Sequence, residues 1–124
     1  MVDEVVTHGE VSVVVIGGAP RVAFLKRPAP DDWRVQTDFG GSVESTDLTD
    51  ELCTVALTAV AGTPATYALV DVVRCGDHWA VMELELIEPS LYLRMDPAAP
   101  RRFAEAVESW FACESRRGAH RVGA

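Results

Sequence analysis

Positive charge is scarce in this 124-residue sequence, which holds a single lysine, Lys26, and carries a formal net charge of −8. A chain this acidic is repelled by phosphate backbones, so we expect no nucleic-acid partner. No apolar run approaches the roughly 18–20 residues that a membrane-spanning helix needs, so we expect no membrane partner either. The three cysteines show no CxxC spacing and follow no secretory signal, which predicts reduced thiols and a cytoplasmic protein.

The length allows one domain with a single core. We expect that domain to span residues 1–114 and to be followed by a disordered tail at 115–124. Apolar runs separated by glycine-containing turns predict two β-hairpins, one between residues 11 and 26 and one between residues 66 and 87.

Helical spacing of apolar residues predicts a helix over residues 48–61, capped by Asp47, and a final helix that begins near Asp96. The expected order is β-β-loop-α-β-β-α. It indicates an α+β domain with a mainly antiparallel sheet and helices on one face. The aromatic and apolar residues expected to face the core from the final helix are Phe103, Val107, Trp110 and Phe111.

Carboxylates interrupt the second hairpin in a pattern that indicates a cation site. Glu83 and Glu85 alternate with leucines and therefore share one strand face, while Asp71 interrupts the apolar run LVDVV on the preceding strand. Turning the hairpin at residues 75–78 brings Asp71 opposite residue 82 or 83. Like charges across strands repel, and a hard divalent cation such as Mg²⁺ relieves that repulsion. The alternative is a solvated acidic sheet face that binds no metal.

The segment between residues 27 and 46 is rich in proline, aspartate, glycine and serine. A loop of this length is uncommon inside a compact domain unless it has a function. It contains Arg34, whose guanidinium can hold phosphate oxygens in a bidentate fork, followed by the pair Gly40 and Gly41. The alternative for Arg34 is an ordinary exposed loop side chain.

These motifs, in this order, resemble the C-terminal half of ATP-grasp enzymes such as glutathione synthetase. In that family a strand with an aspartate precedes a strand with E-x-N and a nearby proline, which LVDVV (69–73) and ELELIEP (83–89) resemble. The segment GEVS (9–12) resembles the opening of this half. The resemblance runs from about residue 2 to residue 112.

The resemblance implies an ATP-dependent carboxylate–amine or carboxylate–thiol ligase with ATP and Mg²⁺ as cofactors. The metal ligands would be Asp71, Glu83 and Glu85, and Arg34 would be the catalytic arginine. The residues that would contact the nucleotide phosphates are Lys26, Arg27, Arg34, Gly40 and Gly41.

Two departures from the family pattern qualify this expectation. Glu85 stands where the family has asparagine, which keeps an oxygen ligand and adds negative charge. The half of the fold that supplies the ATP-contacting lysines would lie before residue 1. We therefore expect either a separate N-terminal partner chain or a truncated copy of a longer enzyme, with little or no turnover by this chain alone. The alternative is a non-catalytic interaction or regulatory module, dimeric because its uncovered apolar surface favours association. A third reading is a small metal-independent α+β domain.

Overall fold

The computed structural model describes residues 8–29, 42–63, 66–86, 91 and 93–122. Its elements, in chain order, are β1 (Glu10–Ile16), β2 (Ala19–Arg27), β3 (Ser42–Thr46), α2 (Asp50–Val60), β4 (Tyr67–Cys75), β5 (His78–Glu85), the 3₁₀ turn η2 (Leu93–Met95) and α3 (Ala99–Val122).

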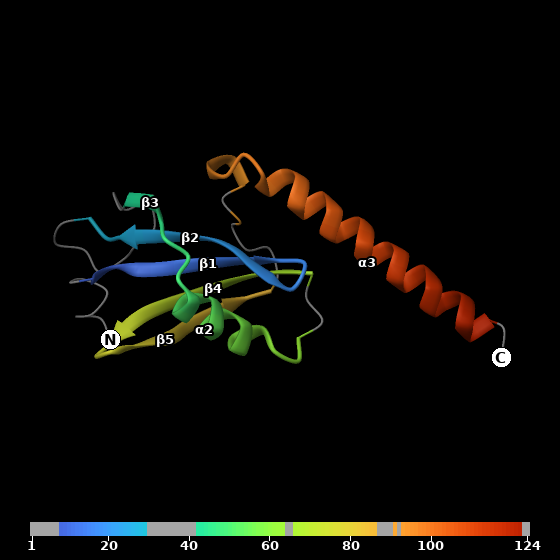
Figure 1. Ribbon diagram of the computed structural model, residues 1–124, viewed down its shortest axis with the longest axis horizontal. Helices are drawn as coiled ribbons and strands as arrows, with labels where there is room; N and C mark the ends of the chain where they lie inside the picture. The colour runs from blue at the N-terminus through green and yellow to red at the C-terminus, as the bar shows by residue number, and fades with distance from the viewer. Residues whose placement is uncertain (1–7, 30–41, 64–65, 87–90, 92, 123–124) are drawn as a thin grey trace.

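One five-stranded sheet in the order β3-β2-β1-β4-β5 forms the body of the domain (Figure 1). Each neighbouring pair of strands is antiparallel. The central strand β1 reads VSVVVI after Glu10 and is buried along its whole length, because strands β2 and β4 flank it and both sheet faces are covered there. Such a β-branched run is suited to the middle of a sheet.

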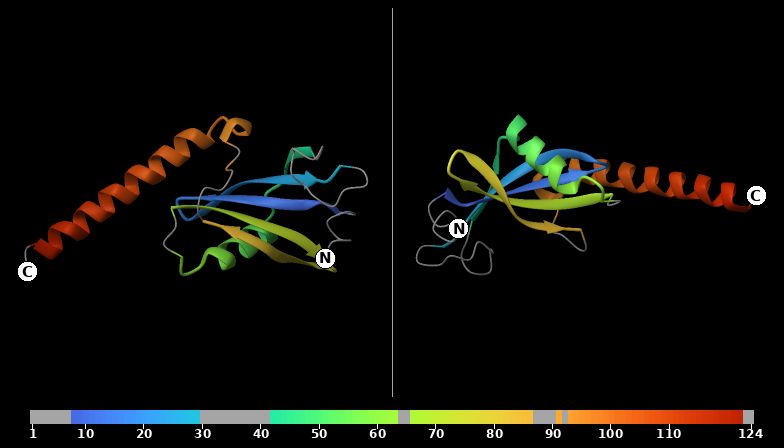
Figure 2. Two further views of the ribbon diagram at one scale, coloured as in Figure 1. Left: turned by 180° about the vertical axis from the view of Figure 1, so that it is seen from behind. Right: turned by 90° about the horizontal axis from the view of Figure 1, so that it is seen from below.

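Helix α2 covers one face of the sheet (Figure 2). Its buried residues Leu52 and Ala56 pack against valines of β1 and β4, such as Val13 and Val70. The helix begins after Thr49, whose side-chain oxygen accepts a hydrogen bond of 3.2 Å from the backbone N–H of Leu52. This cap satisfies one of the free donors of the first helical turn.

The opposite face is divided into an apolar part and a polar part. Phe24, Ile16 and Leu69 form the apolar part, and they pack against η2 and against Phe103 at the start of α3. Beyond that contact α3 extends away from the sheet (Figure 1). The polar part carries the carboxylates that the sequence singles out.

The predicted α+β class with an antiparallel sheet is confirmed, with differences in detail. The two helices pack on opposite faces instead of one. Strand β3 lies in the segment expected to be a loop, because its sequence SVEST lacks the apolar alternation by which a strand is recognised. Helix α2 is capped by Thr49 and not by Asp47, since the helix begins two residues later than expected.

Helix α3 also differs from expectation. Trp110 and Phe111, predicted to face the core, have 44% and 60% of their surface exposed, because the helix leaves the sheet after its first turns. Its backbone continues to Val122, into the segment expected to be a disordered tail, while the domain limits of 1–114 stay a prediction. Within the described residues, no helix combines the length and apolarity needed to cross a membrane.

The two leucines of α2 offer a matched test of this packing. Leu52 is 3% exposed and Leu57 is 44% exposed on the same helix. We expect Leu52→Ala to lower the free energy of unfolding by about 2–5 kcal/mol, because it leaves a cavity in the core. Leu57→Ala should change it by no more than about 0.5 kcal/mol. Urea denaturation followed by circular dichroism measures both, and equal losses would contradict the placement of α2.

Candidate metal centre

One extra residue in β5 determines where the acidic side chains of the second hairpin point. Val72 pairs with Val81, whereas the preceding residue of β4, Asp71, pairs with Glu83. Met82 is therefore the unpaired residue of a β-bulge. Residues directly opposite each other share a sheet face, which places Glu83 beside Asp71. Glu85 follows on the same face, and Leu84 packs on the α2 face.

Three carboxylates therefore converge on the polar part of the sheet. Asp71, Glu83 and Glu85 each offer one oxygen, and these oxygens all lie within 4.8 Å of one another. Asp71 is 3% exposed, whereas Glu83 is exposed and Glu85 is half-buried. The predicted proximity is confirmed, and the register favours Glu83 over residue 82 as the partner of Asp71.

Two donors on the β1 side hold the Asp71 carboxylate. The Ser12 hydroxyl donates a short hydrogen bond to Asp71 Oδ1, and the Lys26 ammonium donates to the same oxygen at 3.1 Å. Lys26 reaches Asp71 from β2 by crossing over β1, a span of two strand spacings or about 9–10 Å. Both donors are buried, as is Asp71 itself, so these contacts form in a medium that strengthens them.

Glu10 completes this buried network from the start of β1. Its carboxylate lies 2.5 Å from Lys26 Nζ. Burial raises the pKa of Glu10, while the hydrogen bond to Lys26 opposes that rise and the charge of Asp71 adds to it. Gly9, just before β1, has a positive φ of 78°. A Cβ added at this position would lie 2.6 Å from the Lys26 carbonyl oxygen, too close for any other residue. Glycine therefore allows Glu10 to approach Lys26.

The surroundings of Glu85 raise the pKa of its carboxyl. Burial raises the pKa of its carboxyl, and the charges of Glu83 and Asp71 raise it further. The folded protein therefore retains a proton on Glu85 at pH values where the unfolded chain has lost it. Its contribution to stability is greatest below the unfolded pKa and is lost as pH rises through the folded pKa. At neutral pH the ionised carboxylate of Glu85 therefore costs stability.

The donor set fits a hard divalent cation. Oxygen ligands from a few carboxylates are what Mg²⁺ prefers, with bonds of about 2.0–2.1 Å. Oxygens on opposite sides of one such ion lie about 4.2 Å apart, so a spread within 4.8 Å needs only small side-chain adjustments. Two cations about 3.5–4 Å apart would also fit carboxylates at this spacing.

Of the five predicted phosphate-binding residues, the structure describes two, and these two lie on opposite faces of the sheet. Lys26 lies on the carboxylate face, in contact with Asp71 and Glu10. Arg27 follows it at the end of β2, is exposed, and by strand alternation points to the opposite face. The other three, Arg34, Gly40 and Gly41, lie outside the described residues. The roles assigned to all five, and to the three carboxylates as metal ligands, stay predictions.

Sequence reasoning missed the contribution of Ser12 and Glu10. It used GEVS only for its resemblance to the opening of the ATP-grasp C-terminal half, but a lone hydroxyl inside VSVVVI carries a signal of its own. Asp71 similarly interrupts the buried run of β4, and β1 pairs with β4 so that Ser12 lies opposite Asp71. Two polar interruptions in neighbouring buried strands imply a hydrogen bond, because buried polar groups are nearly always paired.

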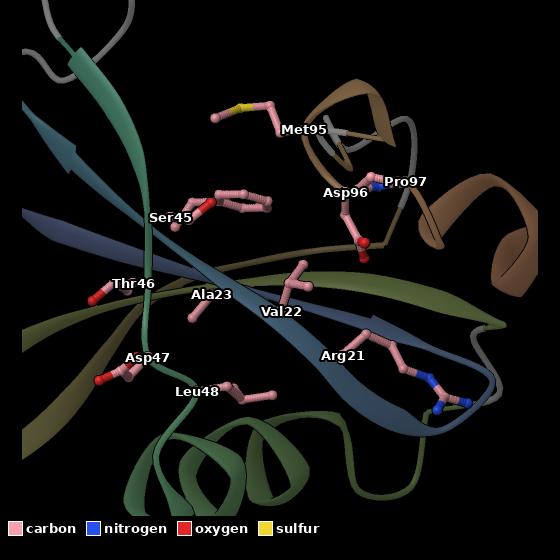
Figure 3. Close-up of a pocket in the computed structure, with 11 residues that line it drawn as sticks. Arg21, Val22, Ala23, Ser45, Thr46, Asp47, Leu48, Met95, Asp96 and Pro97 are labelled. Carbon is pink, nitrogen blue, oxygen red and sulfur yellow. The ribbon is translucent and has the colours of Figure 1, made fainter.

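A separate cavity of about 310 Å³ lies at the other edge of the sheet (Figure 3). Strands β2 and β3 form one wall, and Met95, Asp96 and Pro97 form the other. Asp96 already accepts hydrogen bonds from the backbone of Ala98 and from Arg102. None of the three clustered carboxylates lines this cavity, so the candidate metal centre is separate from it.

Comparison with known proteins identifies a family. The profile of the RimK-like ATP-grasp domain matches residues 3–92. None of the curated protein sequences matches significantly.

Among solved structures, D-cycloserine synthetase DcsG is similar at 29% identity with a TM-score of 0.72, over 86% of this chain and 39% of that one. D-alanine–D-alanine ligase from Bacillus anthracis, complexed with ATP, is similar at 18% identity and a TM-score of 0.58, over 80% and 35%. The ATP-grasp ligase PsnB, complexed with a precursor variant, Mg and ADP, is similar at 17% identity with a TM-score of 0.59, over 84% of this chain and 32% of that one. The chain thus spans between 32% and 39% of the length of these proteins.

Neutralising Glu85 tests the repulsion within the triad. In buffer containing a chelator at pH 7, we expect Glu85→Gln to raise the melting temperature, because it removes a like charge that lies diagonal to Asp71 and two residues from Glu83. Such pairs on one sheet face are worth about 0.2–1 kcal/mol. The gain should shrink at acid pH, where Glu85 of the wild type is itself protonated. Differential scanning calorimetry measures both values. Glu44→Gln on β3, an exposed carboxylate opposite Leu25, is the control and should show no such gain.

Proposed function

Because the chain belongs to the RimK-like ATP-grasp domain family, we propose that it is the part of a carboxylate–amine or carboxylate–thiol ligase that holds magnesium and the phosphates of ATP. The observation that supports this most directly is the convergence of Asp71, Glu83 and Glu85 on one face of the sheet, where Glu83 is exposed to solvent. An excess of negative charge at such a site favours a bound cation, and the cation in turn attracts phosphate.

The proposed roles follow from the chemistry of each side chain. Asp71, Glu83 and Glu85 would hold Mg²⁺, which supplies charge stabilisation to a transferring phosphoryl group when it is bound. Lys26 lies beside them and would contribute positive charge toward phosphate oxygens. Arg34 would hold the acyl phosphate through its guanidinium fork, with Gly40 and Gly41 allowing close approach of the backbone.

We further propose that these residues need a second half to complete the reaction. The chain spans 39% of DcsG, and ATP-grasp enzymes hold their nucleotide between two lobes. The second half would be either another part of a longer polypeptide or a separate partner chain. The 124 residues alone should then bind Mg²⁺ and nucleotide weakly and turn over little substrate.

A non-catalytic interaction module is the second candidate, and one observation favours it. Trp110 and Phe111 are exposed neighbours on α3, with ring centroids 5.0 Å apart. Large exposed aromatics on a helix that leaves the domain are typical of association surfaces. This surface is also compatible with a ligase, whose second half or second copy would cover it.

We expect ADP to bind this chain only when Mg²⁺ is present, because the carboxylates repel phosphate until a cation neutralises them. Isothermal titration calorimetry with ADP, at millimolar Mg²⁺ and with chelator, measures this dependence. Glu83→Ala and Asp71→Asn should each weaken binding at least tenfold by removing a metal ligand. Glu44→Gln should leave it unchanged, since that exposed carboxylate lies on β3 away from the triad.

Magnesium-dependent binding that both ligand variants abolish would support the ligase half-site. Absence of nucleotide binding at millimolar Mg²⁺ would argue against phosphate binding by these residues and favour the interaction module. The oligomeric state, measured by light scattering for wild type and Trp110→Ala, then shows whether the α3 surface associates.

A further inference from the structure

We propose that Ser12 is a positioning residue that, together with Lys26, orients the Asp71 carboxylate toward the cation. The inference rests on the proposed function and deepens it, because it concerns how the same metal centre is held. Ser12 would not touch the metal or the nucleotide. It would determine which oxygen of Asp71 is presented to them.

The geometry separates the two oxygens of Asp71 by their surroundings. Ser12 and Lys26 both donate to Oδ1, and they come from β1 and β2, on one side of β4. Glu83 and Glu85 belong to β5, on the other side of β4. With its two lone pairs accepting two donors, Oδ1 has little capacity left for a metal bond. By this argument, Oδ2 is the oxygen left available to a cation held with Glu83 and Glu85.

Orientation matters here because a carboxylate rotates easily. The terminal torsion of aspartate has a broad, nearly two-fold preference, so packing alone specifies the oxygen positions poorly. A hydrogen bond from a rigid donor removes that freedom. Ser12 is such a donor, since it is fully buried in the central strand and paired with β2 and β4 on either side.

Lys26 alone is a weaker restraint than the pair. Its ammonium reaches across β1 on four methylenes and is shared with Glu10, so its direction toward Asp71 depends on that second carboxylate. The Ser12 hydroxyl stands on the neighbouring strand directly opposite Asp71. Partners that orient a metal ligand from behind typically change metal affinity by 10–100-fold when they are removed.

The test measures cation binding without nucleotide. Titration of the chain with Mn²⁺, followed by the electron paramagnetic resonance of the free ion, reports affinity for a hard oxygen site directly. We expect Ser12→Ala to weaken Mn²⁺ binding by about 10–100-fold and Ser12→Thr, which keeps the hydroxyl, to restore most of the wild-type affinity. Ser12→Cys, of similar size but a weaker donor, should fall between them.

Val14→Ala is the matched control, because Val14 is a fully buried residue of the same strand and the same face. It should lower the melting temperature without changing Mn²⁺ affinity. If Ser12 serves only to stabilise the fold, Ser12→Ala will behave like Val14→Ala, and the inference is overturned. If Ser12→Ala does not fold, unchanged affinity in Ser12→Cys overturns it equally. If the wild-type protein binds no Mn²⁺, the proposed metal centre itself is overturned. If the wild type binds Mn²⁺ but Ser12→Ala binds it equally well, only the role of Ser12 is overturned.

Discussion

The β-bulge at Met82 is the constraint on which the acidic site depends. Continuing the pairing of Val72 with Val81 without the extra residue would place Glu83 opposite Val70, on the face that α2 covers. Two carboxylates would then face an apolar core, where an unpaired charge is very costly. The bulge lets β5 present Trp79 to the α2 core at one end and carboxylates to the open face at the other.

Negative charge is in excess on the polar part of that face. Four carboxyl groups, on Glu10, Asp71, Glu83 and Glu85, gather around the one ammonium of Lys26. Among the described residues, Lys26 forms ion pairs with the two most buried carboxylates, Glu10 and Asp71, whereas Glu83 and Glu85 form none. Buried charges persist only when paired. The unbalanced remainder is therefore found at the exposed edge, where a cation from solvent can reach it.

The sequence predicts most of the secondary-structure elements and the proximity of the three carboxylates. It does not predict which sheet face each helix covers or that β3 forms an edge strand. The apolar runs and the alternation around Glu83 are local patterns, so the antiparallel hairpins and the carboxylate pairing follow from them. Strand β3 forms only because β2 offers it an edge to pair with, which no local pattern in SVEST records. The apolar spacing of α3 predicts a buried face correctly for Phe103 but continues through Trp110, which the sheet does not reach.

The three carboxylates also differ in how freely their strands can move. Asp71 belongs to β4, which is hydrogen-bonded on both sides, whereas Glu83 and Glu85 belong to β5, at the edge of the sheet that the structure describes. Amide hydrogens of a doubly paired strand exchange with solvent mainly through global opening, while edge strands open locally at lower cost in free energy. The triad therefore combines one carboxylate on a strand that is paired on both sides with two carboxylates on an edge strand. In the proposed metal site, Asp71 would fix one side of the cation, while Glu83 and Glu85 could adapt to different numbers of ions or phosphates.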